Sequence, residues 1–142
     1  MNMKDVIAKW FAWLKQAASA DDEQLSHVYS YGRQPWATNG YVLHALDAAT
    51  EESGRVTPND EGLFEVEEAD GMPPFAGALP QGEPAASIVI SAEALRQAAA
   101  GQEGFVQLNL YSENRALELA SAGKYALVMP AIGVSADGFW RP

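Results

Sequence analysis

Apolar residues recur every three or four positions between residues 3 and 19, which is the spacing of one face of an α-helix. The apolar stripe is wide, so we expect this helix to pack closely against a sheet. A second, shorter helix is predicted over residues 92–100. Ser91 is a favourable N-cap for it, and Gly101 is a favourable residue to end it.

The other apolar stretches are short, which is typical of strands rather than helices. Asn39 and Gly40 together form a strong two-residue hairpin signal, because both tolerate a positive φ. Pro35 indicates an edge strand or a bulge. Polar residues 48–60 predict a loop, and residues 70–85, with four prolines, predict a loop or linker. The predicted strands cover residues 25–31, 34–38, 41–46, 63–68, 86–90, 105–111, 116–120 and 125–129, with polar turns at 112–114 and 121–123.

A helix followed by three strands therefore occurs twice in the same order. This order predicts an α+β architecture in which helices cover one face of antiparallel sheets. We further expect an approximate two-fold relation between the two halves. A length of 142 residues suits one domain. We expect that domain over residues 1–142, with a first half at 3–47, an acidic insert at 48–85, a second half at 86–130 and a tail at 131–142.

The formal net charge of −10 is concentrated in one segment. Residues 47–83 hold ten acidic residues and one basic residue, a net charge of −9. The rest of the chain holds nine acidic and eight basic residues, a net charge of −1. This balance argues against tight binding of nucleic acid by a single chain, but it allows weak contacts through the nearly neutral flanks.

Several classes of site are excluded or disfavoured by composition. The chain has no cysteine, which excludes disulfides, thiol catalysis and cysteine-bound zinc. No apolar run approaches the roughly 18–20 residues that a membrane-spanning helix needs. The first residues do not follow the pattern of a secretory signal, so we expect a cytoplasmic protein that does not contact membranes.

Two stretches resemble motifs of bacterial sliding clamps, the DNA polymerase III β subunit family. Residues 37–43 read ATNGYVL, and residues 123–130 read GKYALVMP. Each is similar to a clamp strand with a tight turn beside it. The segment at 89–95, VISAEAL, looks like the entry to the second helix of a clamp domain. The resemblance covers about 100 residues and implies a single DNA-clamp-like domain that performs no chemistry.

The resemblance implies sites for two kinds of partner. Clamp helices face DNA, which makes Lys4, Lys15 and Arg96 candidates for weak, sequence-independent contacts with duplex phosphates. Met129 and Pro130 match residues that help to form the clamp pocket for short apolar peptides, so replication or repair proteins are candidate partners. Solvated surface charges and a core methionine are the alternative interpretations.

The resemblance is compatible with more than one oligomeric state. Clamp chains carry three such domains and form rings of six domains, so a chain with one domain would need six copies. We expect a monomer or a small homo-oligomer in preference to that ring, because Pro35 and the acidic insert would protect sheet edges. A monomeric or dimeric adaptor that binds another protein is therefore the alternative function.

Enzymatic activity has no positive support in the sequence. No nucleophile–base pair, phosphate-binding loop or dinucleotide motif is present. An enzyme that uses His44 and a carboxylate is the third and least favoured hypothesis. His27 has no companion at ligand spacing, and the carboxylates at 60–70 lack the order of a calcium-binding loop. We therefore expect no metal, no cofactor and no catalytic residue.

Overall fold

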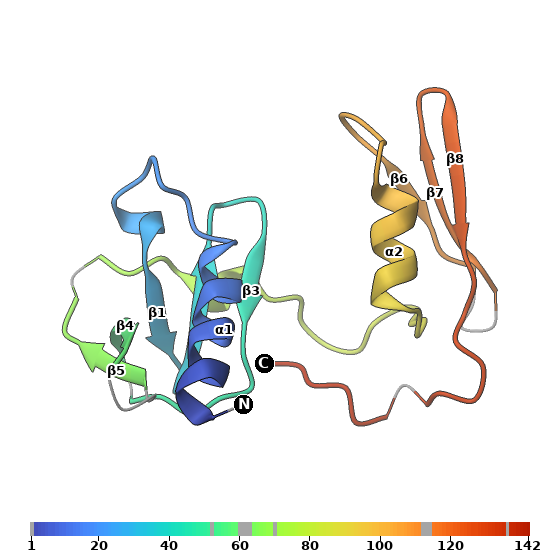
Figure 1. The fold of residues 1–142 in the computed structure, drawn as a ribbon. Helices are drawn as coiled ribbons and strands as arrows, with labels where there is room; N and C mark the ends of the chain where they lie inside the picture. The colour runs from blue at the N-terminus through green and yellow to red at the C-terminus, as the bar shows by residue number, and fades with distance from the viewer. Residues whose placement is uncertain (1, 52, 60–63, 70, 112–114, 136) are drawn as a thin grey trace. The chain divides into compact units, whose positions relative to one another are not determined.

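The chain folds into two compact units, Met1–Pro80 with Pro142, and Gln81–Arg141 (Figure 1). The boundary between them lies inside the segment predicted as an acidic insert. The computed structural model describes residues 2–51, 53–59, 64–69, 71–111, 115–135 and 137–142.

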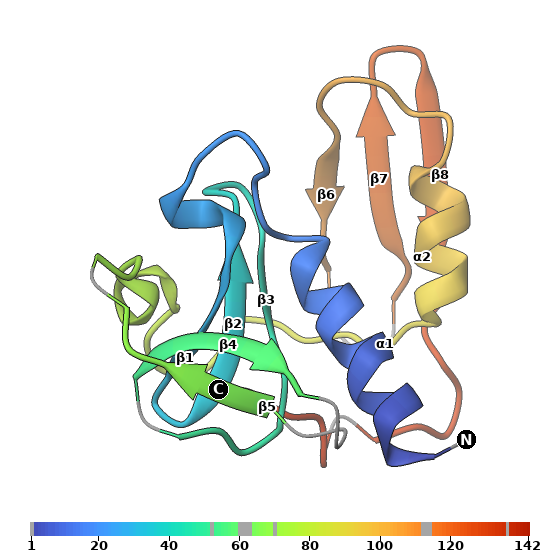
Figure 2. The ribbon, with the colours of Figure 1, turned by 60° about the vertical axis from the view of Figure 1, so that its left-hand side comes forward.

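The first unit is a five-stranded antiparallel sheet covered by helix α1 (Met3–Lys15). The strand order is β3-β2-β1-β4-β5, so β1 lies in the centre of the sheet. Figure 2 shows α1 and the strands of this sheet from a second direction. The strands are β1 (Val28–Tyr31), β2 (Gln34–Thr38), β3 (Leu43–Ala45), β4 (Gly54–Pro58) and β5 (Phe64–Glu67).

Helix α1 is capped at its N-terminus and anchored in the core of the first unit. The Asn2 side chain accepts a hydrogen bond from the Asp5 backbone N–H at 2.9 Å, which satisfies a free donor of the first turn. Leu14 is fully buried and packs in one cluster with Val28, Ala37 and Val56 from three strands. Burial of a side chain of this size stabilises the fold by roughly 1.5–3 kcal/mol. This cluster fixes α1 on one face of the sheet.

An aromatic cluster lies on the other face of the same sheet. Tyr29 and Trp36 are directly paired across β1 and β2, and alternation along the strands points them away from the α1 face. Phe75, only 2% exposed, packs against both of them. It comes from a short 3-10 helix, η2 (Phe75–Ala78), inside the proline-rich segment predicted as a loop or linker. Part of that segment is therefore core.

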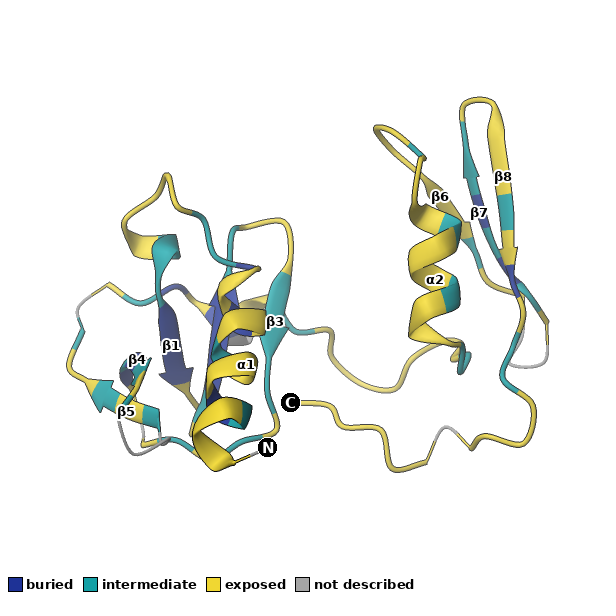
Figure 3. Cartoon of the chain, viewed as in Figure 1, coloured by how far each residue is buried: buried dark blue, intermediate teal, exposed yellow. Residues whose placement is uncertain are grey.

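The second unit is a three-stranded antiparallel sheet, β6-β7-β8, covered on one face by helix α2. Its core consists of Leu117, Leu119 and Val128, with Ala94 and Ala98 of α2 packed against them. Figure 3 shows how little of this unit is buried compared with β1 of the first unit. The elements are α2 (Ala92–Ala99), β6 (Gln107–Asn109), β7 (Leu117–Ser121) and β8 (Lys124–Val128).

The α+β class is confirmed, with two helices and two antiparallel sheets in the part of the chain that the structure describes. The elements predicted at 3–19, 34–38, 63–68, 92–100, 116–120 and 125–129 are all present, with small differences at their ends. Strands β1, β3 and β6 are shorter than predicted. The predicted turn at 112–114 lies outside the described residues.

Three local predictions were wrong. Residues 48–60 contain strand β4, which pairs with the central strand through Val28 and Val56. Residues 86–90 do not form a strand, and the bond from the Ala131 N–H to the Val89 carbonyl (2.8 Å) is a single link rather than a ladder. The hairpin between β2 and β3 uses four residues, because the Asn39 side chain accepts from the N–H groups of Tyr41 and Val42.

No described residue belongs to a helix with the length and apolar character that crossing a bilayer would require. The longer helix, α1, has 13 residues.

Candidate functional site

The two lysines predicted to contact DNA both lie on α1 and are exposed. Lys15, in the last turn, donates to the Ser26 carbonyl at 2.8 Å, so its ammonium group is held near the strand that follows. Lys4 lies in the first turns of the same helix. Lys9 is also exposed, but it lies about 140° around the helix from Lys4 at 100° per residue. The helix thus carries three lysines and one aspartate in a strongly acidic unit.

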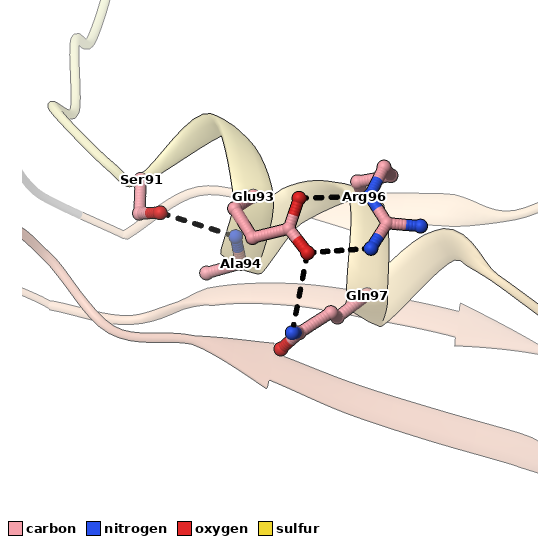
Figure 4. A network of polar contacts seen from close by, with 5 residues as sticks. All are labelled: Ser91, Glu93, Ala94, Arg96 and Gln97. Atoms are coloured by element: carbon pink, nitrogen blue, oxygen red, sulfur yellow. Dashed lines mark hydrogen bonds and ion pairs between the residues drawn. The ribbon is translucent and has the colours of Figure 1, made fainter.

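Arg96 lies on α2 and is already paired. Its guanidinium group donates to both carboxylate oxygens of Glu93, at 2.8 and 2.5 Å, one turn earlier on the same helix (Figure 4). The hydrogen bond from Arg96 lowers the pKa of Glu93, and the carboxylate in turn raises the pKa of Arg96. Gln97 donates to the same carboxylate. Because Glu93 balances the charge of Arg96, its guanidinium group attracts a phosphate less strongly than the group of an unpaired arginine would.

The lysines belong to the first unit and Arg96 belongs to the second. Of the three candidates, only Lys4 and Lys15 belong to the same unit, and they lie at opposite ends of α1.

Met129 follows β8 and is 67% exposed, whereas Pro130 is half-buried. A hollow of about 330 Å³ in the same unit is lined by residues 87–90 together with Phe139 and Arg141. Neither Met129 nor Pro130 lines it. The exposed methionine is accordingly a surface feature at the end of β8, separate from this hollow.

The face of the β6–β8 sheet opposite α2 carries a polar–aromatic cluster that sequence reasoning missed. Glu118 on β7 accepts hydrogen bonds from the hydroxyl groups of both Tyr111 and Tyr125. The hydrogen bond from Tyr111, followed in size by the hydrogen bond from Tyr125, lowers the pKa of Glu118. The carboxylate in turn raises the pKa of each tyrosine. Leu127 and Met129 are exposed and follow Tyr125 by two and four positions, which is the spacing of side chains on one face of a strand. Alternation in β7 and β8 was the signal that could have revealed this face.

The two histidines have aromatic partners rather than metal-ligating ones. His44 stacks on Trp13, and His27 meets the Tyr29 ring edge to face at 6.2 Å. Among the described residues there is no group of three His, Cys, Asp or Glu side chains arranged to hold a metal ion. The carboxylates at 60–70, which lack the order of a calcium-binding loop, fall in part outside the described residues.

Comparison of the chain with protein-family models, curated proteins and solved structures found no match.

Proposed function

We propose that the chain is a cytoplasmic, non-enzymatic protein of the sliding-clamp type that associates with DNA as a replication accessory factor. The observation that carries the proposal is the repeated order of elements. Helix α1 precedes the meander β1-β2-β3, and helix α2 precedes the meander β6-β7-β8, with each helix packed on one face of its sheet. Strands β4 and β5 extend the first sheet.

Contact with DNA rests on Lys4 and Lys15 of α1, supported by the smaller contribution of Arg96. Two or three phosphate contacts give weak affinity that does not depend on base sequence. The first unit holds thirteen acidic and five basic residues, a net charge of −8, so most of its surface repels a duplex. We therefore expect binding only at low salt.

The test is fluorescence anisotropy with a labelled duplex over a series of salt concentrations. The wild-type affinity should fall with a log–log slope no steeper than about −3, as expected for three neutralised phosphates. A variant with Lys4→Glu, Lys15→Glu and Arg96→Glu should lose binding. A matched variant with Arg33→Glu, Arg115→Glu and Arg141→Glu has the same change in charge and should bind more tightly than the first.

Equal loss in both variants would show that only total charge matters, and the assignment of Lys4, Lys15 and Arg96 would be wrong. Light scattering on the free protein tests assembly. We expect a mass of one or two chains, and a stable six-chain particle at micromolar concentration would instead support a closed ring.

A protein-binding adaptor is the second candidate, favoured by the exposed side chains of Tyr125, Leu127 and Met129 in the second unit. Exposed apolar groups gathered on one sheet face are typical of surfaces that bind proteins. If wild-type protein fails to bind the duplex at low salt, the adaptor function is preferred. Leu127→Glu with Met129→Glu should then abolish capture of partner proteins, whereas Ile132→Glu, which changes an exposed residue outside the strands, should not.

A further inference from the structure

A hollow of about 550 Å³ lies in the first unit, between α1, the segment at 47–51 and strand β5. Its apolar lining comes from Ile7 and Trp10 of the helix and Phe64 of the strand. The segment at 47–51 also lines the hollow, with Asp47 and Glu51 at its two ends. Its volume falls within the roughly 300–1,000 Å³ of pockets that hold small organic molecules.

The aromatic wall of the hollow is open to a ligand. Ile7 is 6% exposed and packs into the unit, but Trp10, one turn later, is 39% exposed. An indole ring that borders a hollow offers a large apolar surface and an electron-rich face. Such a face attracts ammonium and guanidinium groups.

The end of the 47–51 segment at Thr50 and Glu51 is fixed by hydrogen bonds to β1 and to the turn that follows it. The Thr50 backbone N–H donates to the Arg33 carbonyl at 2.9 Å. The buried Ser30 hydroxyl lies 2.5 Å from the Thr50 hydroxyl and also donates to the Glu51 carbonyl. These contacts hold the backbone at Thr50 and Glu51, so a ligand would meet a Glu51 carboxylate whose backbone position is set in advance.

Within the described part of the chain, no ion pair neutralises the carboxylates of Asp47 and Glu51. Among the described residues the ion pair is that of Arg96 with Glu93, in the other unit, and no lysine or arginine lines the hollow. The net charge of −8 on the surrounding unit adds to the negative potential at the hollow. An anionic or strongly polar neutral ligand is therefore disfavoured. A metal ion is also disfavoured, because the described residues contain no three-ligand group.

We propose that this hollow binds a small organic cation with an apolar stem, of the alkylguanidinium or alkylammonium class. The stem lies against Trp10, Ile7 and Phe64, and the charged head pairs with Asp47 and Glu51. This binding site lies outside the DNA and partner sites of the proposed function and does not depend on them.

The probe is agmatine, an alkylguanidine with a terminal amine, titrated into the full chain at physiological salt and followed by NMR. The indole N–H signal of Trp10 is assigned with a Trp10→Phe variant. We expect that signal to shift and saturate at roughly millimolar agmatine or below. Butylurea, which has a similar shape and no charge, should bind at least about tenfold more weakly because it forms no charge-assisted hydrogen bonds.

Variants locate the site. Asp47→Asn with Glu51→Gln should weaken agmatine binding about tenfold or more. The matched control, Glu67→Gln with Glu68→Gln, removes the same charge from exposed positions of the same unit and should change affinity by less than about twofold, because salt screens distant charges. Thermal melts confirm that each variant is folded. If the first pair does not fold, Trp10→Leu replaces it with the same expectation, and isothermal titration calorimetry follows binding because this variant lacks the indole signal. The proposal is overturned if agmatine does not shift the Trp10 signal, if butylurea binds equally well, or if both variant pairs bind alike.

Discussion

The His44 imidazole lies flat against the Trp13 indole, with ring centroids 4.1 Å apart and planes 11° from parallel. Its Nδ1 atom is 2.8 Å from the Trp13 carbonyl oxygen. One side chain of β3 thereby holds both the ring and the backbone of the last turns of α1. The stack and the hydrogen bond link the edge strand of the sheet to the helix that covers it.

Replacement of His44 by alanine should lower the free energy of unfolding of the first unit by about 1–2 kcal/mol, since a stacked pair and one hydrogen bond are lost. Urea denaturation followed by circular dichroism measures the change. Val42→Ala, at an exposed position just before the same strand, is the control and should have little effect. Equal effects in the two variants would contradict a specific role for the stack.

Gly54 at the start of β4 should not tolerate a side chain. Its φ is +145°, and an added Cβ would lie 2.4 Å from the Glu67 carbonyl oxygen and 2.5 Å from a Val66 methyl group. Gly54→Ala should therefore destabilise the first unit by about 1–3 kcal/mol. Gly77→Ala is the matched control, because Gly77 has ordinary φ and open space around its Cα. A stable Gly54→Ala variant in a thermal melt would show that β5 moves aside.

His27 should make stability depend on pH near neutrality. Burial lowers its pKa below the ordinary 6.5, and the positive charges of Arg55 and Lys15 lower it further. The unfolded chain then binds a proton at His27 more readily than the folded chain does. The contribution of His27 to the free energy of unfolding is therefore present above about pH 6.5 and is lost as the pH falls below that value.

Denaturation at about pH 7 and about pH 5.5 tests this, with His27→Gln as the comparison. The wild type should lose more stability across this interval than the variant does. Carboxylates with a pKa below 4.5, such as Glu93 and Glu118, titrate at lower pH and contribute little to the difference. Parallel curves for the two proteins would contradict the lowered pKa.

The two tyrosines that donate to Glu118 should set its titration. Tyr111→Phe with Tyr125→Phe removes both hydrogen bonds, so the pKa of Glu118 should rise toward its ordinary value. Carboxyl carbon NMR measures this directly. Tyr41→Phe removes a hydroxyl group from the other unit and should leave the Glu118 titration unchanged. An unchanged pKa in the double variant would mean that the hydroxyl groups bind water instead.

The elements that could be predicted from sequence are those with local signals. The i, i+3, i+4 spacing and the Asn2 and Ser91 caps define the helices within short windows. Strand β4 has no such signal, because Val56 is its one apolar side chain between polar neighbours and a proline. Its place beside β1 depends on pairing with Val28, 28 positions earlier in the chain. Pairing over that distance is set by the whole sheet rather than by its own residues.

The candidate sites also divide into those with a local sequence signal and those assembled from distant segments. The exposure of Lys4 and Lys15 follows from the helical pattern, and the Arg96–Glu93 pair follows from their i, i+3 spacing. The hollow beside Trp10 joins residues from three distant segments, including Asp47 and Phe64. Only tertiary structure brings those segments together, so no spacing in the sequence indicates it.

Phe75 also affects how the chain can fold while it is being synthesised. The rings it covers, Tyr29 and Trp36, leave the ribosome about forty residues before it does. During that interval β1 and β2 can pair and α1 can pack on one side, but the aromatic side of the sheet remains open to water and to chaperones. Translation of the proline-rich segment is the step that closes it. A nascent chain halted before Phe75 would hold a paired sheet with one bare aromatic face.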